Sequence, residues 1–235
     1  MSPAARIAVI AALPREIAPL ISGWRRVASP KGERKMSLAI SEDAVVACAG
    51  MGPARVTLAL EAAQSLGPVS AIVSVGFAGA LTAATPVGRL YRPSTVIDVR
   101  TGERFACATG DESIAVTAPQ IASAVEKARL SLAYSAQLVE MEAATLGRLA
   151  SIRQLPFFCF KAISDDASFS LPILNNFATA DGQFRTAAFA AHILQRPGLW
   201  NAARELGRGA KLAQQSLVAG LRQWLAEQSA QHLSY

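Results

Sequence analysis

The sequence is poor in the residues that build metal sites and disulfide frameworks. Its 235 residues include three cysteines, Cys48, Cys107 and Cys159, and two histidines, His192 and His232. The cysteines are scattered in or beside apolar runs, no CxxC spacing occurs, and no histidine lies near them in sequence. This pattern argues against a zinc site. It predicts reduced core thiols, no metal and no cofactor.

Other absences narrow the class of protein further. No uninterrupted apolar run reaches the ~18 residues of a membrane span, and the longest candidate, 71–85, is broken by Gly76 and Gly79 and predicts a strand followed by a loop. Aromatic residues make up 6% of the chain and do not interleave with basic clusters, so the net charge of +6 is a poor signal for nucleic-acid binding. The short apolar N-terminal stretch predicts a core strand rather than a signal peptide. We therefore expect a cytoplasmic protein without a nucleic-acid partner.

What is present is a core-rich chain in which predicted strands and helices alternate. Apolar residues make up 51% and charged residues 17%. Apolar runs predict strands at 6–12, within 36–49, at 71–76, within 87–117, and at 135–139 and 157–163. Helical spacing predicts helices at 14–23, between 53 and Pro68, at 119–130, and from Met141. The alternation predicts one α/β domain over residues 1–235 with a mainly parallel sheet.

The C-terminal segment has a different character. From Leu199 to about residue 229, apolar residues recur every three to four positions, which predicts one long amphipathic helix. Such a helix would pack across the sheet. Basic residues among the intervening positions favour the alternative, a peripheral contact with a membrane surface or a partner; they include Arg204, Arg208 and Lys211.

Two acidic segments stand where predicted strands end. Val139-Glu140-Met141-Glu142 opens a helical pattern, and Ile163-Ser164-Asp165-Asp166 closes an apolar run. In open α/β sheets the carboxyl ends of the strands form the edge that binds ligands. Carboxylates gathered at this edge suggest recognition of sugar hydroxyls and proton transfer to a leaving group.

Five motifs together carry a family resemblance. They are AALPREIAPL (11–20), CAGMGPARV (48–56), SVGFAGAL (74–81), VEMEAATLGRLA (139–150) and FKAISDDAS (160–168). In order and spacing they resemble the nucleoside phosphorylase superfamily, particularly its nucleosidase branch that cleaves methylthioadenosine and adenosylhomocysteine. The resemblance implies a single-domain, three-layer nucleoside-phosphorylase-like fold with a mixed, largely parallel sheet. It also implies a small-molecule nucleoside substrate and a homodimer.

The resemblance implies a role for each acidic position. Glu142 would hold the ribose hydroxyls, as a carboxylate can accept from two neighbouring hydroxyls, with Met141 beneath the sugar. Asp165 would face N7 of the purine and assist departure of adenine, with Ser164 positioning its carboxylate. Glu16 would activate the attacking water. Glu140 is a further candidate for substrate binding, or is structural.

The residues alone also allow simpler interpretations. Glu142 is a favourable first-turn helix acid, and Glu16 could be an exposed helix glutamate. An aspartate after a strand often caps the following loop. Asp166 could fill that capping role as well as Asp165, so the two could be confused.

The chain departs from the family pattern in two ways that bear on the reaction. Phe77 follows Gly76 where the hydrolase branch usually has a serine, and the segment around Ile121, which corresponds to the base-stacking segment, lacks the usual aromatic. Phosphorolytic relatives hold phosphate with arginines and hydroxyls, but here only Arg15 and Arg55 lie nearby. We therefore expect water as the nucleophile. Phosphorolysis is the alternative, and a nucleoside-binding module without turnover is the third.

The length of the chain between Gly88 and Val116 gives a hint about the substrate. This stretch is shorter than in methylthioadenosine nucleosidases, where it helps to close the site over the 5′ group. The segments VGRLYRPSTVIDVRTGERF and 180–200 resemble hopanoid-associated phosphorylase-like proteins. That resemblance implies removal of adenine from adenosylhopane, a nucleoside with a large apolar 5′ group.

Overall fold

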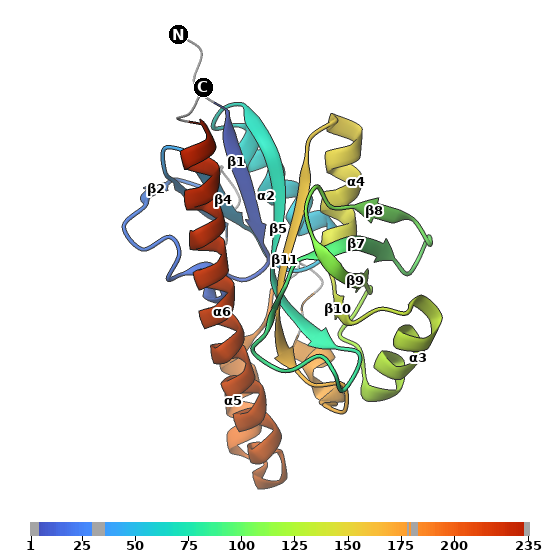
Figure 1. The fold of residues 1–235 in the computed structure, drawn as a ribbon. Coiled ribbons are helices and arrows are strands. Elements are labelled where there is room, and N and C mark those ends of the chain that lie inside the picture. The colour runs from blue at the N-terminus through green and yellow to red at the C-terminus, as the bar shows by residue number, and fades with distance from the viewer. Residues whose placement is uncertain (1–4, 30–35, 178, 180–182, 233–235) are drawn as a thin grey trace.

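The computed structural model describes residues 5–29, 36–177, 179 and 183–232. Figure 1 shows a central sheet flanked by helices. Its strands are β1 (Arg6–Ala11), β2 (Arg25–Val27), β3 (Ser37–Ile40), β4 (Ala44–Cys48), β5 (Val69–Ala80), β6 (Leu90–Tyr91), β7 (Pro93–Asp98), β8 (Arg104–Ala106), β9 (Asp111–Thr117), β10 (Leu138–Glu140) and β11 (Phe157–Asp165). The helices are α1 (Pro14–Ile17), α2 (Pro53–Gln64), α3 (Ala124–Tyr134), α4 (Ala143–Arg153), α5 (Thr186–Leu194) and α6 (Trp200–His232), with 3₁₀ turns η1 (Pro172–Phe177) and η2 (Pro197–Leu199).

The sheet is mixed, and its long central pairs are parallel. The strand order is β2-β3-β4-β1-β5-β10-β9-β7-β8, and β11 pairs with both β5 and β6. Strand β1 pairs in parallel with β4 and β5, and β11 runs parallel to β5. The antiparallel pairs include β2–β3, β3–β4 and β7–β8 at the two ends of the order. The predicted α/β fold with a mixed sheet is confirmed.

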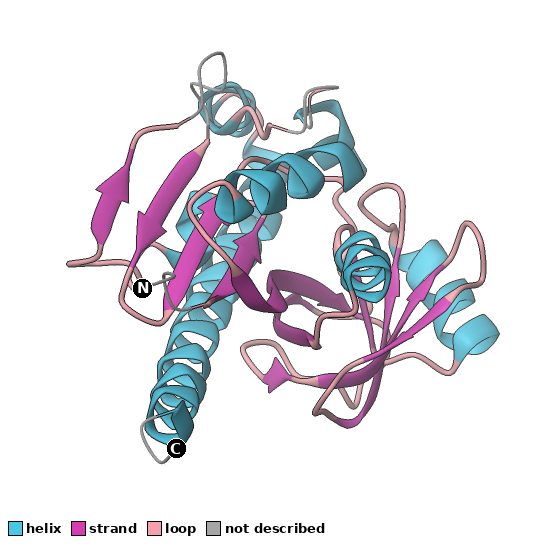
Figure 2. Cartoon of the chain, turned by 90° about the horizontal axis from the view of Figure 1, so that it is seen from above, coloured by secondary structure: helices cyan, strands magenta, loops and turns pink. Residues whose placement is uncertain are grey.

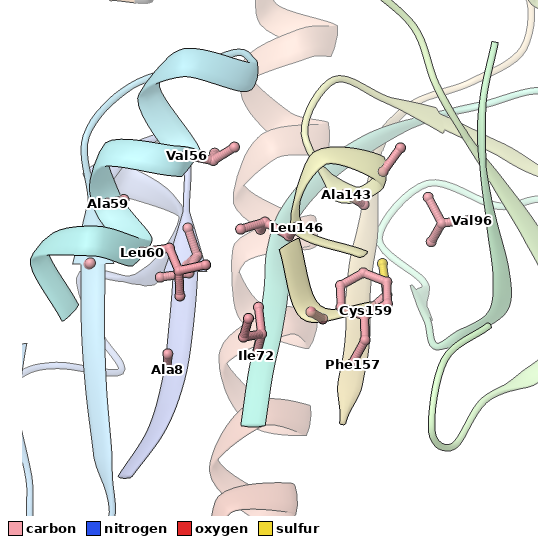
Figure 3. Close-up of a cluster of buried hydrophobic side chains, with 14 of the residues drawn as sticks. Ala8, Val56, Ala59, Leu60, Ile72, Val96, Ala143, Leu146, Phe157 and Cys159 are labelled. Carbon is pink, nitrogen blue, oxygen red and sulfur yellow. The ribbon is translucent and has the colours of Figure 1, made fainter. Parts of the chain in front are cut away.

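Helices cover both faces of this sheet and make three layers. On one face, α2 and α4 bury an aliphatic core against β1, β4 and β5, including Val56, Leu60, Ile72 and Leu146 (Figure 3). On the other face, α6 packs on β11 and β5 through Ala213, Leu217, Leu221 and Trp224. Figure 2 shows the sheet between these helices from above.

The two halves of the C-terminal helix α6 have different surroundings. Its second half packs on the sheet, as the amphipathic spacing predicts, while its first half continues past the sheet beside α5 (Figure 1). Gly209 lies where the helix passes the end of β11, and a Cβ there would be 2.0 Å from the Ser164 carbonyl oxygen. Only glycine allows this approach. None of the described helices is long and apolar enough to cross a membrane.

Three predicted elements differ from the structure. Strand β5 continues through Gly76 and Gly79 to Ala80, so the loop predicted after Gly76 is wrong. The helix expected at 14–23 ends at Ile17 and turns follow it, and the helix expected at 119–130 spans Ala124–Tyr134. Glycines in a strand interior usually mark bulges or close approaches, and here they make room for neighbouring side chains.

Candidate active site

A pocket of about 310 Å³ lies at the carboxyl ends of β1, β5, β10 and β11, where α/β sheets bind ligands. The α5–α6 pair and η1 complete its wall. All nine of the sequence-predicted site residues are at or beside this pocket: eight line it, and Gly76 adjoins Glu16. The eight are Glu16, Phe77, Ile121, Glu140, Met141, Glu142, Ser164 and Asp165.

Glu16 is a buried carboxylate held by two backbone amides. Glu16 is 4% exposed. One oxygen accepts from Leu13 N–H at 2.9 Å and the other from Phe77 N–H at 3.2 Å. Gly76 has φ +152°, and a Cβ there would be 3.1 Å from Oε1 of Glu16. Burial raises the pKa of Glu16, although Leu13 N–H and the Lys161 charge act to lower it. The interpretation of Glu16 as an exposed helix residue is therefore wrong.

Glu142 and Glu140 stand side by side but have different partners. Glu142 accepts from Gly52 N–H at 2.9 Å. Burial and the neighbouring Glu140 raise the pKa of Glu142 to about 7, although Lys161 and Gly52 N–H oppose this rise. Glu140 accepts from the amides of Glu142 and Ala143 and forms an ion pair with Lys161 at 2.9 Å. Glu140 therefore holds the turn that presents Glu142, and Glu142 is the freer carboxylate.

Asp165 and Asp166, which the sequence could not separate, have different surroundings. Asp166 caps the loop after β11, because one of its oxygens accepts from Ser168 N–H at 2.8 Å and Phe169 N–H at 2.7 Å. The Ser168 hydroxyl also lowers the pKa of Asp166 by hydrogen bonding. Asp165 lines the pocket instead, and its Oδ1 accepts from the Ser164 hydroxyl at 2.6 Å.

Lys127 on α3 is a charged pocket residue that the sequence does not mark. It is 2% exposed, lines the pocket and forms an ion pair with Asp165 Oδ2 at 2.5 Å. In the segment AVEKARL this lysine looks like an ordinary solvated helix residue. Its spacing of three from the buried Leu130 is the one sequence signal that could have placed it on the inner face of α3.

The far side of the pocket is apolar. Phe77 lies close to Arg15, whose guanidinium stands 6.0 Å from the Phe77 ring and 5.9 Å from the Phe184 ring. The helical wall adds side chains from η1, α5 and α6, namely Leu174, Phe189, Ala203, Leu206 and Ala210. At Ile121, the main-chain N–H and C=O both bond the side-chain amide of Asn175, each at 3.2 Å.

Four carboxylates and two cations line the pocket within the described residues. One of the two cations, Lys127, already binds Asp165. The second, Arg15, packs near aromatic rings, and Arg55 donates to the Ala49 carbonyl at 2.7 Å. An excess of carboxylates disfavours an anion such as phosphate. Among the described residues no group of three His, Cys, Asp or Glu side chains is arranged to hold a metal ion.

Comparisons with known proteins agree with this fold. Residues 6–135 match the model of the family described as the phosphorylase superfamily, and the chain belongs to that family. Similar solved structures include futalosine hydrolase of Helicobacter pylori strain 26695 (TM-score 0.70, 14% identity, 95% of this chain and 98% of that chain). Arabidopsis thaliana 5′-methylthioadenosine nucleosidase matches with TM-score 0.70 and 15% identity over 96% of each chain.

A third similar structure is a putative 5′-methylthioadenosine/S-adenosylhomocysteine nucleosidase from Francisella philomiragia ATCC 25017. It has TM-score 0.68 and 18% identity, over 95% of this chain and 99% of that chain. A search of curated protein sequences gave no match. At these identities the structural likeness establishes the fold.

Proposed function

We propose that the protein hydrolyses the N-glycosidic bond of a 5′-substituted adenosine and releases adenine. The observation that carries this proposal is the convergence of Glu16, Glu142 and Asp165 on one pocket. Glu16 adjoins Gly76 and Asp165 adjoins Gly79 of the same strand. Two carboxylates placed at separate points along one strand suit a base and an acid on opposite sides of a glycosidic bond.

Each carboxylate has a chemical task in this reaction. Glu16 takes a proton from water as the water oxygen attacks C1′ of the sugar, and burial, which raises the pKa of Glu16, makes it a stronger base than an exposed glutamate. The C1′–N9 bond breaks, its electron pair passes to the adenine, and Asp165 delivers a proton to N7. Glu142 accepts from the ribose hydroxyls and orients the ring.

The adenine end of the pocket has a main-chain pair suited to a planar base. Ile121 offers one N–H and one C=O, and the Asn175 amide bonds both. An amide presents the same donor and acceptor pattern as the edge of adenine that carries the 6-amino group. Adenine could therefore bond Ile121 in place of Asn175, without an aromatic residue to stack on it.

Water is favoured over phosphate by the charge of the pocket. Phosphorolysis requires cations that neutralise an incoming anion, whereas this pocket is lined mainly by carboxylates. The decisive measurement is adenine release from a panel of 5′-substituted adenosines with and without phosphate. Release that depends on phosphate would replace hydrolysis by phosphorolysis. If no nucleoside in the panel released adenine, the remaining hypothesis would be a nucleoside-binding module without turnover.

A variant of Glu16 tests the assigned base. In Glu16→Ala we expect kcat to fall by ~10² or more with little change in KM, because a water-activating base acts mainly in the transition state. Glu112→Ala, which changes an exposed glutamate on β9, is the matched control. Unchanged turnover in Glu16→Ala would remove this role and reopen phosphorolysis.

We further propose that the 5′ substituent is large and apolar, with adenosylhopane as the best candidate. The wall formed by Leu174, Phe189 and Leu206 supports this, because it offers apolar contacts where a polar substituent would lose its hydration. The segment 180–200 that carried part of the hopanoid resemblance includes residues 180–182, which lie outside the described residues.

The substrate proposal is tested by comparing kcat/KM for methylthioadenosine and a long-chain 5′-alkyl adenosine in detergent. We expect the long-chain nucleoside to be preferred, and Leu206→Gln to remove much of that preference. Leu212→Gln changes an exposed leucine on the same helix and is the control. A clear preference for methylthioadenosine in the unmodified protein would contradict the apolar-substrate proposal.

Peripheral membrane contact is part of the same proposal. The α5–α6 turn exposes Leu194 (73%) and Trp200 (42%), and Arg196 and Arg204 lie beside them in the sequence. Basic residues near an anionic bilayer contribute ~1 kcal/mol each. Co-sedimentation with vesicles containing anionic lipid should therefore exceed that with neutral vesicles. Equal sedimentation with both would argue against an electrostatic contact.

We also propose a homodimer. Helix α3 exposes Val125 (81%) and Leu132 (87%), two large apolar side chains that a second copy could cover. Analytical ultracentrifugation of the unmodified chain measures the mass directly. A single monomeric species at micromolar concentration would contradict this proposal.

A further inference from the structure

The least expected group in the pocket is the buried ammonium of Lys127. Lysine is almost never fully buried unless it is paired, and its side chain loses about 2 kcal/mol of rotamer entropy when fixed. Lys127 and Leu130 are the two buried residues of α3, and the others are exposed or partly exposed. A lysine at this inner position therefore needs a specific reason.

The surroundings of Lys127 use all of its hydrogen-bonding capacity. An ammonium group has three N–H donors. Lys127 Nζ donates to Asp165 Oδ2, to the Asp166 carbonyl at 2.6 Å, and to the Phe169 carbonyl at 3.3 Å. The ammonium thus ties α3 to both the candidate acid and the loop that follows it.

A neighbouring glycine makes space for the pair. A Cβ on Gly79 would lie 2.9 Å from Asp165 Oδ2 and 3.1 Å from Lys127 Cε. Any side chain at residue 79 would push the ammonium and the carboxylate apart. Strand β5, the lysine and the aspartate therefore form one packed unit.

We propose that Lys127 is the positioning residue for Asp165 and the source of the proton that Asp165 passes to the leaving base. This inference rests on the proposed nucleosidase function. In the empty pocket the proton resides on the ammonium, and Asp165 is a carboxylate fixed by Lys127 and the Ser164 hydroxyl. Asp165 touches the base, and Lys127 acts through it.

The proton balance of this step is closed. Lys127 Nζ passes its proton to Oδ2 of Asp165. As the C1′–N9 bond breaks and its electron pair passes to the base, N7 takes this proton from Oδ2, so that a carboxylate and a neutral amine remain. Glu16 holds the proton taken from water and releases it to solvent. After the base departs, the amine regains one proton from solvent through the open pocket.

The pH dependence of turnover distinguishes this role from a structural one. With Lys127 the proton is stored on an amine, so turnover should persist into alkaline solution. In Lys127→Met the carboxyl group of Asp165 must store the proton alone, and activity should be lost as the pH rises. We expect the alkaline limb of kcat to move to lower pH by at least one unit and kcat at pH 8 to fall by ~10².

Three further variants make the test specific. Lys127→Arg keeps the charge that positions Asp165 but cannot release a proton, so turnover should fall as in Lys127→Met, while Arg148→Met removes an ion pair away from the pocket and should leave the profile unchanged. If Lys127→Met does not fold, Lys127→Met combined with Asp165→Asn avoids an unpaired buried charge. In the Asp165→Asn background the lysine change should alter kcat by less than about twofold, because the two residues act as one unit.

The outcomes separate the two proposals. Turnover by the unmodified protein together with the shifted limb in Lys127→Met supports the inference. Turnover with an unchanged limb in Lys127→Met, or an independent tenfold loss in the Asp165→Asn background, overturns it and leaves the nucleosidase proposal intact. Absence of turnover in the unmodified protein with every nucleoside overturns the proposed function itself.

Discussion

Two buried lysine–carboxylate pairs lie within one pocket region, and they have different environments. Lys161 and Glu140 have side chains that are 1% and 0% exposed, between β11 and β10. Lys127 is equally buried, but its partner Asp165 is 17% exposed and lines the pocket. A sealed pair can only hold the structure together. Because Asp165 is partly exposed, the Lys127–Asp165 pair can meet a ligand, whereas the side chains of the Lys161–Glu140 pair are closed off.

The strength of the sealed pair follows from its surroundings. Burial disfavours the charged form of Lys161, but Glu140, with smaller contributions from Cys159 and Glu142, outweighs this and raises the pKa of Lys161. Glu140 in turn fixes the turn amides of Glu142 and Ala143. The Lys161–Glu140 pair thus supports the turn that carries Glu142, the carboxylate proposed to hold the ribose.

The largest effect should come from breaking the sealed pair. Lys161→Met leaves Glu140 buried without its counter-charge, and loss of one partner of a buried pair costs ~3–5 kcal/mol. Chemical denaturation should show this loss in the free energy of unfolding. Adding Glu140→Gln to Lys161→Met should recover part of it. A cost under about 1 kcal/mol for the single variant would mean that the pair is not structural.

Breaking the open pair should affect turnover more than stability. Asp165→Asn should lower kcat by ~10² or more, because it removes the group proposed to deliver a proton to the base. Circular dichroism should show an intact fold. Asp166→Asn is the matched control, since the Asp166 carboxylate caps the loop after β11. A crippled Asp166→Asn beside a mild Asp165→Asn would reverse the assignment.

Glu142 is a buried carboxylate beside Glu140, and its replacement should raise stability while it weakens binding. Its folded pKa of about 7 lies above the ordinary 4.5, so the folded state retains a proton that the unfolded state releases. The stability from this group is present below pH 4.5 and is lost as the pH rises toward 7. Glu142→Gln should therefore stabilise the fold at pH 8 by on the order of 2 kcal/mol while raising KM. Denaturation at pH 5 and pH 8 measures the difference, and equal effects at both would contradict it.

The smallest effect is expected for an ion pair on the surface. Arg148 pairs with Asp98 at 3.2 Å and with Glu103, and its side chain is 38% exposed. Exposed pairs of this kind contribute little because water screens them. Arg148→Met should shift the melting temperature by less than about 2 °C. A shift as large as that of Lys161→Met would show that burial is not what separates these pairs.

Much of the fold was predictable because local patterns and tertiary packing agree. The strands near 6–12 and 157–163 and the long C-terminal helix follow from apolar runs and helical spacing, and the structure confirms them. Strand β5 was cut short in the prediction because Gly76 and Gly79 look like loop residues. They are strand residues whose missing side chains admit Glu16 and the Lys127–Asp165 pair, which no local pattern reveals.

The candidate site was predictable to the extent that motifs mark it. Glu16, Glu142 and Asp165 stand at strand ends, and the structure brings them to one pocket; their roles remain predictions. Lys127 was missed because a lysine in an amphipathic helix is normally solvated. Its burial depends on a carboxylate 38 residues away in the chain, so only the folded structure shows the pair.

The C-terminal helix has a consequence for how the protein can change. Helix α6 is 33 residues long. It packs on the sheet through Leu217 and Trp224, and it forms part of the pocket wall through Leu206 and Ala210. Gly209 allows α6 to lie close to the end of β11. A mutation that alters how the second half of α6 packs on the sheet therefore also alters the shape of the pocket beside its first half. Substitutions in α6 that change the stability of the protein would therefore also change the pocket. Likewise, substitutions that adapt the pocket to a new substrate would change the stability.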